Sequence, residues 1–397
     1  MSEPMNAQSF EVPAVVDRIR QRALLVGGLG VLAMVAGAVT NPAEFFHAYL
    51  GAFIFWTSLA LGCLGLLMVH HLSGGAWGLV IRRILEAGAR TLPLMLVLFV
   101  PLTLGLPHVY EWAQPEVVAK DPILQHKQPF LNTPFWILRT VIYFALWSGM
   151  TYLLTKWSSE QDARPGAPYD TRFGKVSGPG LVVFGLTLSL ASVDWMMSVD
   201  PHWFSTIYGF VMVGGAGLSA LCLVAMTLSL LSREAPLAGV VTDSHFHDIG
   251  KLTFAFVMLY AYFTFSQFLI IWSANLPEEI PWYLRRLSNG WQYVMLALVL
   301  LHFALPFALL LSANIKQHAG MLARIAALVF VMRIVDVFFQ VAPQFHEQFT
   351  LHWQHVATVV GLGGLWFAAF AHLLRGRPVL PVNDPYFQKA LAEHGSH

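Results

Sequence analysis

Four charged residues lie in, or at the start of, stretches that are otherwise strongly apolar. Arg333 and Asp336 are three residues apart, so on a helix they share one face. Asp194 stands in another apolar stretch, and Arg139 stands near the start of a third. An ionisable residue inside a membrane helix costs about 2.5–3.5 kcal/mol on insertion scales, so it usually marks function. We expect the four to form one charged cluster. The cluster would either hold the helices together through ion pairs, or bind the head group of a quinone or transfer protons. The second interpretation is chemically reasonable because a carboxylate beside an arginine can take up and pass on a proton.

Two further candidates follow the stretch that holds Asp194. Asp200 and His202 flank Pro201 at the predicted outer mouth of the helices. Aspartate is a good helix N-cap, whereas imidazole titrates near neutral pH, so the pair is either a cap or a proton exit. His302 is the one histidine of 16 that falls near the middle of an apolar stretch, and it joins the proton-path candidates.

A polar segment on the opposite side contains two histidines beside aspartates. Its candidates for an inner proton-collecting mouth are His245, His247, Asp248 and Lys251. Helix capping by Asp248 explains the pattern as well. A metal site is weakly indicated, because no third ligand stands at a suitable spacing.

Helices that cross a membrane must position these residues. The chain is 56% hydrophobic and only 11% charged, against about a quarter charged in soluble proteins, which excludes a soluble globular enzyme and a disordered chain. A net charge of +1 gives no sign of the basic surface that a nucleic-acid-binding protein would need. With about 20 apolar residues per crossing, the sequence predicts an all-α integral membrane protein. Its ten candidate spans are roughly 22–40, 48–70, 90–107, 134–156, 179–197, 206–232, 251–275, 288–313, 319–341 and 353–374.

The basic residues predict the orientation of these spans. Of 23 lysines and arginines, 17 fall on the side of the N-terminus and four on the other. Because basic residues favour the cytoplasmic side, we expect both termini to be cytoplasmic. Residues 1–21 and 375–397 would then form cytoplasmic tails flanking a membrane domain over 22–374.

A short internal repeat suggests how the membrane domain is organised. Val193-Asp194, Val199 and Pro201 recur 142 residues later as Val335-Asp336, Val341 and Pro343. This offset separates spans five and nine by four helices, so both copies run in the same direction. We therefore expect two parallel four-helix bundles, about 48–200 and 206–343, with the first and tenth spans peripheral.

The sequence predicts no haem, iron–sulfur cluster or metal bound by this chain itself. The two cysteines, Cys63 and Cys222, lie in apolar runs and are too few for a cluster or a disulfide framework. The sequence has no CxxCH haem-attachment motif. His70 and His372 could in principle pair as ligands of a b-type haem at the inner face, but four-histidine spacing is absent.

Several stretches resemble one family closely. They are residues 77–83 (WGLVIRR), 194–206 (DWMMSVDPHWFST), 247–252 (HDIGKL), 260–279 (YAYFTFSQFLIIWSANLPEE) and 333–336 (RIVD). These are similar to the smaller of the two polysulfide-reductase-type, or NrfD-like, membrane subunits of bacterial alternative complex III, a quinol:cytochrome c oxidoreductase. The resemblance covers residues from about 20 to 375.

The resemblance implies a fold, partners and an activity. Such subunits have ten helices in two four-helix bundles and sit in the bacterial inner membrane. Their partners are a larger homologous NrfD-like subunit, a periplasmic iron–sulfur subunit related to molybdopterin oxidoreductases, and multihaem and monohaem cytochromes c. The complex oxidises quinol and delivers electrons to a cytochrome c or a terminal oxidase. In the family, the best supported quinol site belongs to the larger subunit, and the smaller one is linked more securely to proton conduction.

Two other classes of function remain open from the sequence. A secondary transporter with two parallel repeats would need helices broken near the midplane, for which Pro306 and the prolines of the third span give weak support. A b-type haem anchor would show itself in an absorption spectrum.

Overall fold

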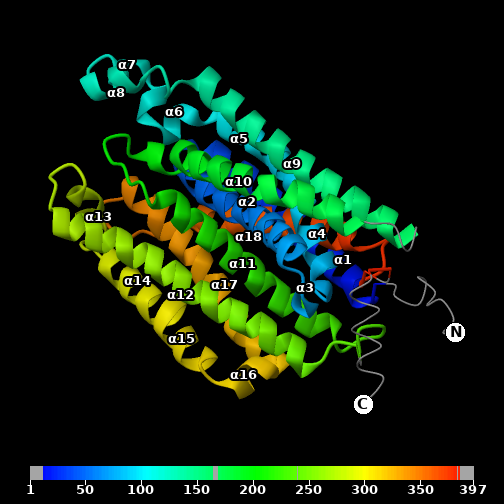
Figure 1. Ribbon diagram of the computed structural model, residues 1–397. Helices are drawn as coiled ribbons and strands as arrows, with labels where there is room; N and C mark the ends of the chain where they lie inside the picture. The colour runs from blue at the N-terminus through cyan, green and yellow to red at the C-terminus, as the bar shows by residue number, and fades with distance from the viewer. Residues whose placement is uncertain (1–11, 164–168, 239, 382, 385–397) are drawn as a thin grey trace, which may run out of the picture.

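The computed structural model describes residues 12–163, 169–238, 240–381 and 383–384. Over these residues it contains helices and connecting turns without a strand, and ten segments are long and apolar enough to cross a membrane, which confirms the predicted all-α membrane fold (Figure 1). The spans are α1 (Val15–Thr40), α2 (Pro42–Ser73), α4–α5 (Arg82–Ala89 and Leu92–Leu104), α9 (Thr133–Ala163), α10 (Tyr169–Trp195), α11 (Tyr208–Leu231), α12 (Asp243–Ala274), α14–η4–α15 (Trp291–Ala297, Leu298–Ala304 and Leu305–Leu310), α17 (Ala319–Val341) and α18 (Trp353–Leu374).

Eight of the ten spans pack in two groups of four. Around α2 lie α4–α5, α9 and α10. In the second group α11 packs against α12 and α17, and α14–η4–α15 packs against α12 and α17 in turn. The two central helices, α2 and α11, are the most deeply buried spans and pack against each other. They approach each other closely at Gly62, where a Cβ would lie 1.9 Å from the carbonyl oxygen of Ala216. These groups provide the scaffold for Asp194 and Asp336, which lie on α10 and α17.

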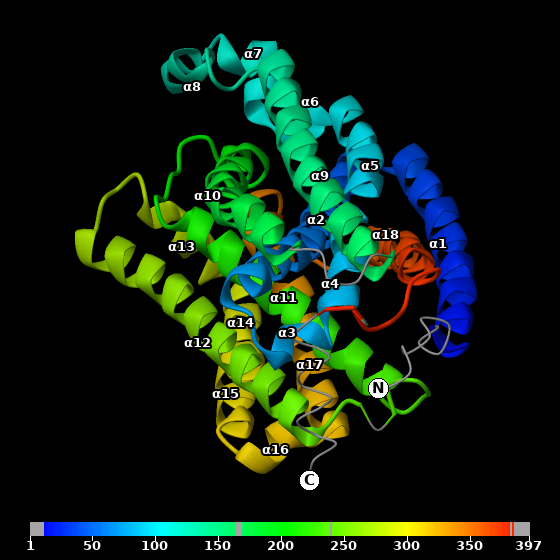
Figure 2. The same ribbon diagram turned by 45° about the vertical axis from the view of Figure 1, so that its right-hand side comes forward.

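The first and last spans form a pair at one flank of the molecule (Figure 2). Glycines allow α1 and α18 to approach closely, since a Cβ on Gly30 would lie 2.2 Å from Cα of Gly361. Small residues at such a contact are typical of helix pairs in membranes, because van der Waals packing drives their association. The opposite face of α1 carries exposed leucines such as Leu25 and Leu29, as expected of a surface in contact with lipid.

The connection between the third and fourth spans, the longest one on the predicted outer side, is made of short helices. They are α6 (Leu106–Val109), η2 (Glu111–Ala113), α7 (Pro115–Val118) and α8 (Pro122–Lys127), and they gather at one end of the molecule (Figure 1). Asp121 caps α8 by accepting hydrogen bonds from the backbone N–H groups of Ile123 and Leu124. Tyr110 anchors the connection to α10, because its hydroxyl donates to the carbonyl oxygen of Trp195 at 3.0 Å.

Several helices extend beyond their predicted boundaries. Helix α1 begins at Val15, so residues 15–21 extend the first helix. The third span begins at Arg82 and is interrupted between α4 and α5, where the prediction began at residue 90. Residues 158–163 and 169–178, which lie between the predicted spans 134–156 and 179–197, belong to α9 and α10. The predicted ends were placed where the apolar stretches end, but helical hydrogen bonding continues into the polar residues beyond them.

A buried polar cluster holds part of the predicted C-terminal tail. Arg82 donates to Glu86 at 3.1 Å and to Asp384 at 2.9 Å, and Arg83 donates to Glu86 at 2.8 Å. Asn383 donates to the backbone oxygen of Asp162. Buried arginines need counter-charges, and residues 383–384 supply one from the chain's far end. Arg164 and Lys389, which contribute to the predicted orientation, lie outside the described residues.

Candidate functional site

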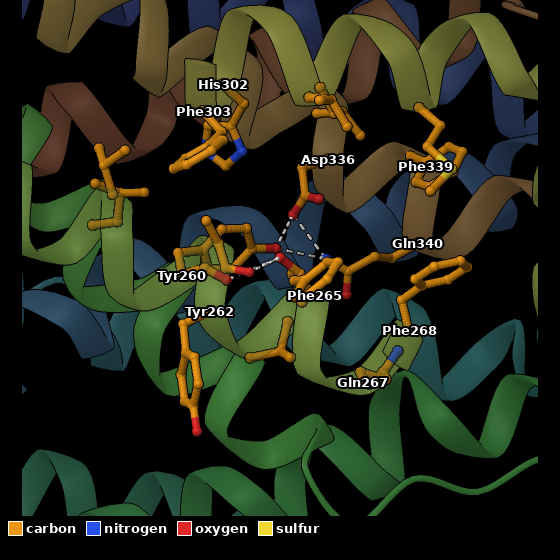
Figure 3. Close-up of a pocket in the computed structure, with 18 of the residues that line it drawn as sticks. Tyr260, Tyr262, Phe265, Gln267, Phe268, His302, Phe303, Asp336, Phe339 and Gln340 are labelled. Atoms are coloured by element: carbon orange, nitrogen blue, oxygen red, sulfur yellow. Dashed lines mark hydrogen bonds between the residues drawn. The ribbon is translucent and has the colours of Figure 1, made fainter. Parts of the chain in front are cut away.

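Three side chains converge on one carboxylate oxygen of Asp336. Gln340 donates from Nε2 to Oδ2 at 2.7 Å, and the Tyr260 hydroxyl donates to the same oxygen (Figure 3). Arg333 completes the set with an ion pair. Asp336 is 6% exposed and Arg333 only 1%. No donor of a described residue contacts Oδ1 of Asp336. The ion pair therefore satisfies one oxygen and leaves the other available to a bound molecule.

The helical spacing on α17 assembles most of this group. Arg333, Asp336 and Gln340 stand at i, i+3 and i+7, so one face of the helix presents all three. The guanidinium of Arg333 fits against α11 only because residue 215 is glycine, where a Cβ would lie 2.2 Å from Nη2. Arg333 also lies over the ring of Tyr260, 4.4 Å from its centroid, which adds a cation–π contact.

Asp336 lines a cavity of about 550 Å³ between α12, α14–η4 and α17 (Figure 3). Its wall is mainly apolar and aromatic, with Phe268 and Phe303 beside the few polar groups. Tyr262 and Phe265 also line it, and both are more than 60% exposed on α12. The cavity therefore opens on the side of the second bundle that would face lipid. Its size falls within the usual range for small-molecule sites.

His302 faces the same cavity from an unusual stretch of helix. Residues Leu298–Ala304 form a π-helical turn, a feature that often occurs at functional sites. The ring of His302 lies 5.2 Å from that of Tyr260, and its buried Nε2 has no hydrogen-bond partner among the described residues. A buried polar atom of this kind usually has a partner, so His302 is ready to bond a molecule in the cavity.

Polar side chains continue from the cavity toward the predicted outer end. The hydroxyl of Tyr208 donates to Oε1 of Gln340 at 3.1 Å. One turn further, Gln344 accepts a hydrogen bond from Arg285, and Arg285 also pairs with Asp200 at 3.0 Å. The candidate Asp200 is therefore at the outer end of a polar row that starts at Asp336.

Two residues of α13 (Ile280–Arg286) add fixed polar groups near the cavity. Burial raises the pKa of Tyr283 to about 12, so its hydroxyl stays protonated, and Gln267 donates to it at 3.3 Å. Burial also lowers the pKa of Arg286 to about 9, which leaves it cationic at neutral pH. Arg286 donates to the backbone oxygen of Gln340 at 2.6 Å and lies over the ring of Trp282. These contacts fix the end of α17 above the cavity.

The other predicted aspartate, Asp194, forms a separate and closed ion pair. Arg139 donates from Nη2 to Oδ1 at 2.6 Å and from Nε to Oδ2 at 2.9 Å, and the Tyr143 hydroxyl donates to Oδ2 at 2.8 Å. Asp194 is completely buried, and the guanidinium lies between the rings of Phe130 and Phe135. The four charges expected in one cluster thus form two pairs, one in each bundle, because Arg139 and Arg333 each neutralise a different aspartate.

The remaining candidates lie away from the cavity. His202 is exposed and pairs with Asp121 of α8 at 2.7 Å, a surface contact. Desolvation alone would raise the pKa of Asp121, but hydrogen bonds from Ile123, Leu124 and His202 outweigh it, so the pKa of Asp121 is lowered. Asp121 is therefore ionised at neutral pH.

The inner candidates surround the start of α12. His245 completes a capping box with Thr242, and Lys251 pairs with Asp248 at 3.1 Å on an exposed surface. His247 lies on the same turn. Asp248 is 12 residues before Tyr260, roughly 18 Å along the helix. The structure therefore does not bring the inner group to the cavity.

Tyr260 and Gln340 are site residues that the sequence reasoning missed. Gln340 carried a signal, because it stands four residues after Asp336 on the same helix. Tyr260 comes from a different helix, and only the packing of α12 against α17 brings it to Asp336. The buried group of Arg82, Arg83 and Glu86 was missed as well, although its i, i+3 and i, i+4 spacings are typical of helical ion pairs.

A comparison of the sequence with models of known protein families finds no match. A comparison with curated proteins likewise finds none.

Proposed function

We propose that this chain is an integral membrane subunit of a respiratory quinol:cytochrome c, or other quinol:acceptor, oxidoreductase. The proposal rests on the carboxylate of Asp336, which lines an aromatic cavity open toward lipid. Its Oδ2 accepts hydrogen bonds from the protein, whereas its Oδ1 is available to a bound molecule. A quinol is a planar ring on a lipid-soluble tail, so it partitions into the bilayer and would reach such a cavity sideways. The resemblance to the smaller NrfD-like subunit of alternative complex III supports the same class of complex.

Each polar group in the cavity has a part in quinol oxidation. Oδ1 of Asp336 accepts the proton of one quinol hydroxyl, while the ion pair with Arg333 holds the carboxylate in place through Oδ2. Nε2 of His302 bonds the other hydroxyl and accepts its proton. Oxidation of one quinol yields a quinone, two protons and two electrons. The electrons pass to an iron–sulfur or haem centre of a partner subunit, and the two protons are released toward the outer end, where Asp200 lies.

The chain lies in a bacterial inner membrane with both termini cytoplasmic. Its partners are a larger homologous membrane subunit, a periplasmic iron–sulfur subunit, and cytochromes c, with a terminal oxidase downstream. A quinone such as menaquinone binds non-covalently, and the chain carries no redox cofactor of its own.

The lining of the cavity favours a quinol over the solute of a secondary transporter. Transporters bind polar substrates with unwound backbone groups near the midplane. Here aromatic and aliphatic side chains form most of the wall, and the polar groups gather at one side.

Replacement of Asp336 by asparagine tests the proposal. Asp336→Asn keeps the shape and most hydrogen bonds of the side chain but removes the proton acceptor. Because general bases contribute about 100-fold or more to such steps, we expect quinol oxidation per assembled complex to fall by at least about tenfold. Turnover is measured with a water-soluble quinol and a cytochrome c acceptor, and assembly by the subunit content of the purified complex.

The matched control is Asp194→Asn, which makes the same change in the closed ion pair. We expect its turnover per assembled complex to stay near that of the unmodified protein. Equal turnover and equal proton release in both variants and the unmodified complex would contradict the proposed role of Asp336.

A further inference from the structure

Three potential metal ligands meet at the predicted outer end of the molecule, away from the cavity. Glu44 lies in the first turn of α2, His346 follows the turn η5 (Ala342–Gln344), and His355 lies in the first turn of α18. Nε2 of His346 is 3.2 Å from Oε2 of Glu44, and Nδ1 of His355 is 3.4 Å from Oε1. One ligand atom from each residue lies within 4.8 Å of the other two.

These ligand atoms are buried and lack hydrogen-bond partners. Glu44 and His355 are 8% and 7% exposed, more than nine-tenths buried. Oε1 of Glu44, Nε2 of His346 and Nδ1 of His355 are all without a hydrogen bond from any described residue. Buried polar atoms in proteins nearly always have a partner, so three that point at one another call for a ligand between them.

The separations suit a tetrahedral metal ion. Bonds of about 2.0–2.1 Å from Zn²⁺ to nitrogen or oxygen place neighbouring ligand atoms roughly 3.3–3.5 Å apart. The nearest nitrogen–oxygen separations, 3.2 Å from His346 to Oε2 of Glu44 and 3.4 Å from His355 to Oε1, are close to that length. The three ligand atoms already lie within 4.8 Å of one another, and rotation of the carboxylate and the imidazole rings would bring them around one ion.

The local structure holds the ligands in place. Asn41 caps α2 by accepting a hydrogen bond from the backbone N–H of Glu44 at 3.3 Å. The N–H of His355 donates to the backbone oxygen of His352 at 3.1 Å, and Phe338 packs against the His355 ring. Ligands on helix ends with packed rings are close to the preorganised arrangement that metal sites need.

We propose that Glu44, His346 and His355 bind a divalent transition-metal ion, Zn²⁺ above all, with water as the fourth ligand. Two imidazoles with one carboxylate favour Zn²⁺ over Mg²⁺ and Ca²⁺, which prefer oxygen ligands throughout. The ion fastens the segment 342–352 and the start of α18 to the start of α2. The site is independent of the proposed function, and it replaces the expectation of no metal in this chain. Spacing along the chain does not reveal this site, because Glu44 and His346 are about 300 residues apart.

Zinc content and affinity test the site. The full chain is purified with its associated subunits, and zinc per chain is measured by mass spectrometry for the unmodified protein and for Glu44→Gln, His346→Gln and His355→Gln. We expect about one zinc fewer per chain in each variant and at least about tenfold weaker binding in zinc titrations. His126→Gln is the matched control, because it removes an exposed histidine from α8 at the same end of the molecule.

Thermal unfolding and cobalt binding give independent results. Added zinc should raise the unfolding temperature of the unmodified protein and of His126→Gln, but not that of His355→Gln. Should the ligand variants fail to fold, Co²⁺ added to the unmodified protein should give the visible absorption of a tetrahedral site, displaced by zinc. Zinc content and affinity that do not differ between the unmodified protein and the variants, or no cobalt spectrum, would overturn the proposal.

Discussion

Asp194 and Asp336 are both aspartates near the ends of helices that run in the same direction, yet their surroundings give them different chemistry. Both oxygens of Asp194 accept hydrogen bonds from Arg139 and Tyr143, and the residue has no contact with solvent or cavity. The donors at Asp336 all bond Oδ2. A carboxylate with both oxygens bonded stabilises the fold, whereas one with an available oxygen beside a cavity can exchange a proton.

Removal of the cation from the closed pair should destabilise the protein strongly. Arg139→Met would leave the fully buried carboxylate of Asp194 without its counter-charge. Breaking a buried ion pair in this way costs about 3–5 kcal/mol, so we expect a clearly lower unfolding temperature and a lower yield of folded protein. Thermal unfolding in detergent, followed by light scattering or tryptophan fluorescence, measures the effect.

The double variant Arg139→Met/Asp194→Leu is the control. Replacement of both partners by apolar side chains of similar size is often nearly neutral, so stability should recover in large part. A double variant no more stable than Arg139→Met would show that the rings of Phe130 and Phe135, and not the charge, need the guanidinium.

Local spacing predicted part of the site at this scale. The three-residue separation of Arg333 and Asp336 placed them on one face of a helix, and the structure pairs them. The partner of Asp194 could not be assigned in the same way, because Arg139 lies 55 residues earlier on another helix. Which arginine meets which aspartate depends on how α9 packs against α10, and spacing along the chain does not contain that information.

Glycines set the positions of the helices at the scale of elements. Gly215 on α11 makes room for Arg333, Gly62 lets α2 approach α11, and Gly30 lets α1 approach α18. Each of these glycines stands in an apolar run. The sequence alone does not show whether a glycine there lies at a close helix contact or faces open space. Gly28, two residues from Gly30, shows the difference, because a Cβ there would meet nothing within 4 Å.

Gly30→Leu should therefore separate α1 from α18. A side chain at residue 30 would overlap the backbone of Gly361, and the helix pair can relieve this only by moving apart. We expect a lower unfolding temperature and easier proteolysis near α1. Gly28→Leu makes the same change on the lipid-facing side of the helix and should behave like the unmodified protein. Similar losses in both variants would assign the effect to helix propensity and not to packing.

At the scale of the whole molecule, hydropathy was sufficient for the number of spans and for the fold class. Each predicted span overlaps an observed one, since about 20 apolar residues are needed wherever the chain crosses a bilayer. The ends of the helices were less predictable. Polar stretches such as residues 158–163 continue α9 because backbone hydrogen bonding does not stop where the apolar run does. The contact of Asp384 with Arg82 depends on the complete fold.

The orientation of the molecule in its membrane is a prediction that two single cysteines can test. Ser244 and Glu278 are exposed at opposite ends of α12, and the two native cysteines are buried, so background labelling should be low. Because most basic residues lie on the side of Ser244, we expect a membrane-impermeant maleimide to label Glu278→Cys in intact spheroplasts and Ser244→Cys only after lysis. Labelling is followed by the mass shift of the purified chain. The reverse pattern would place the cavity and the polar row from Asp336 to Asp200 on the cytoplasmic side, so protons from quinol would return to the cytoplasm.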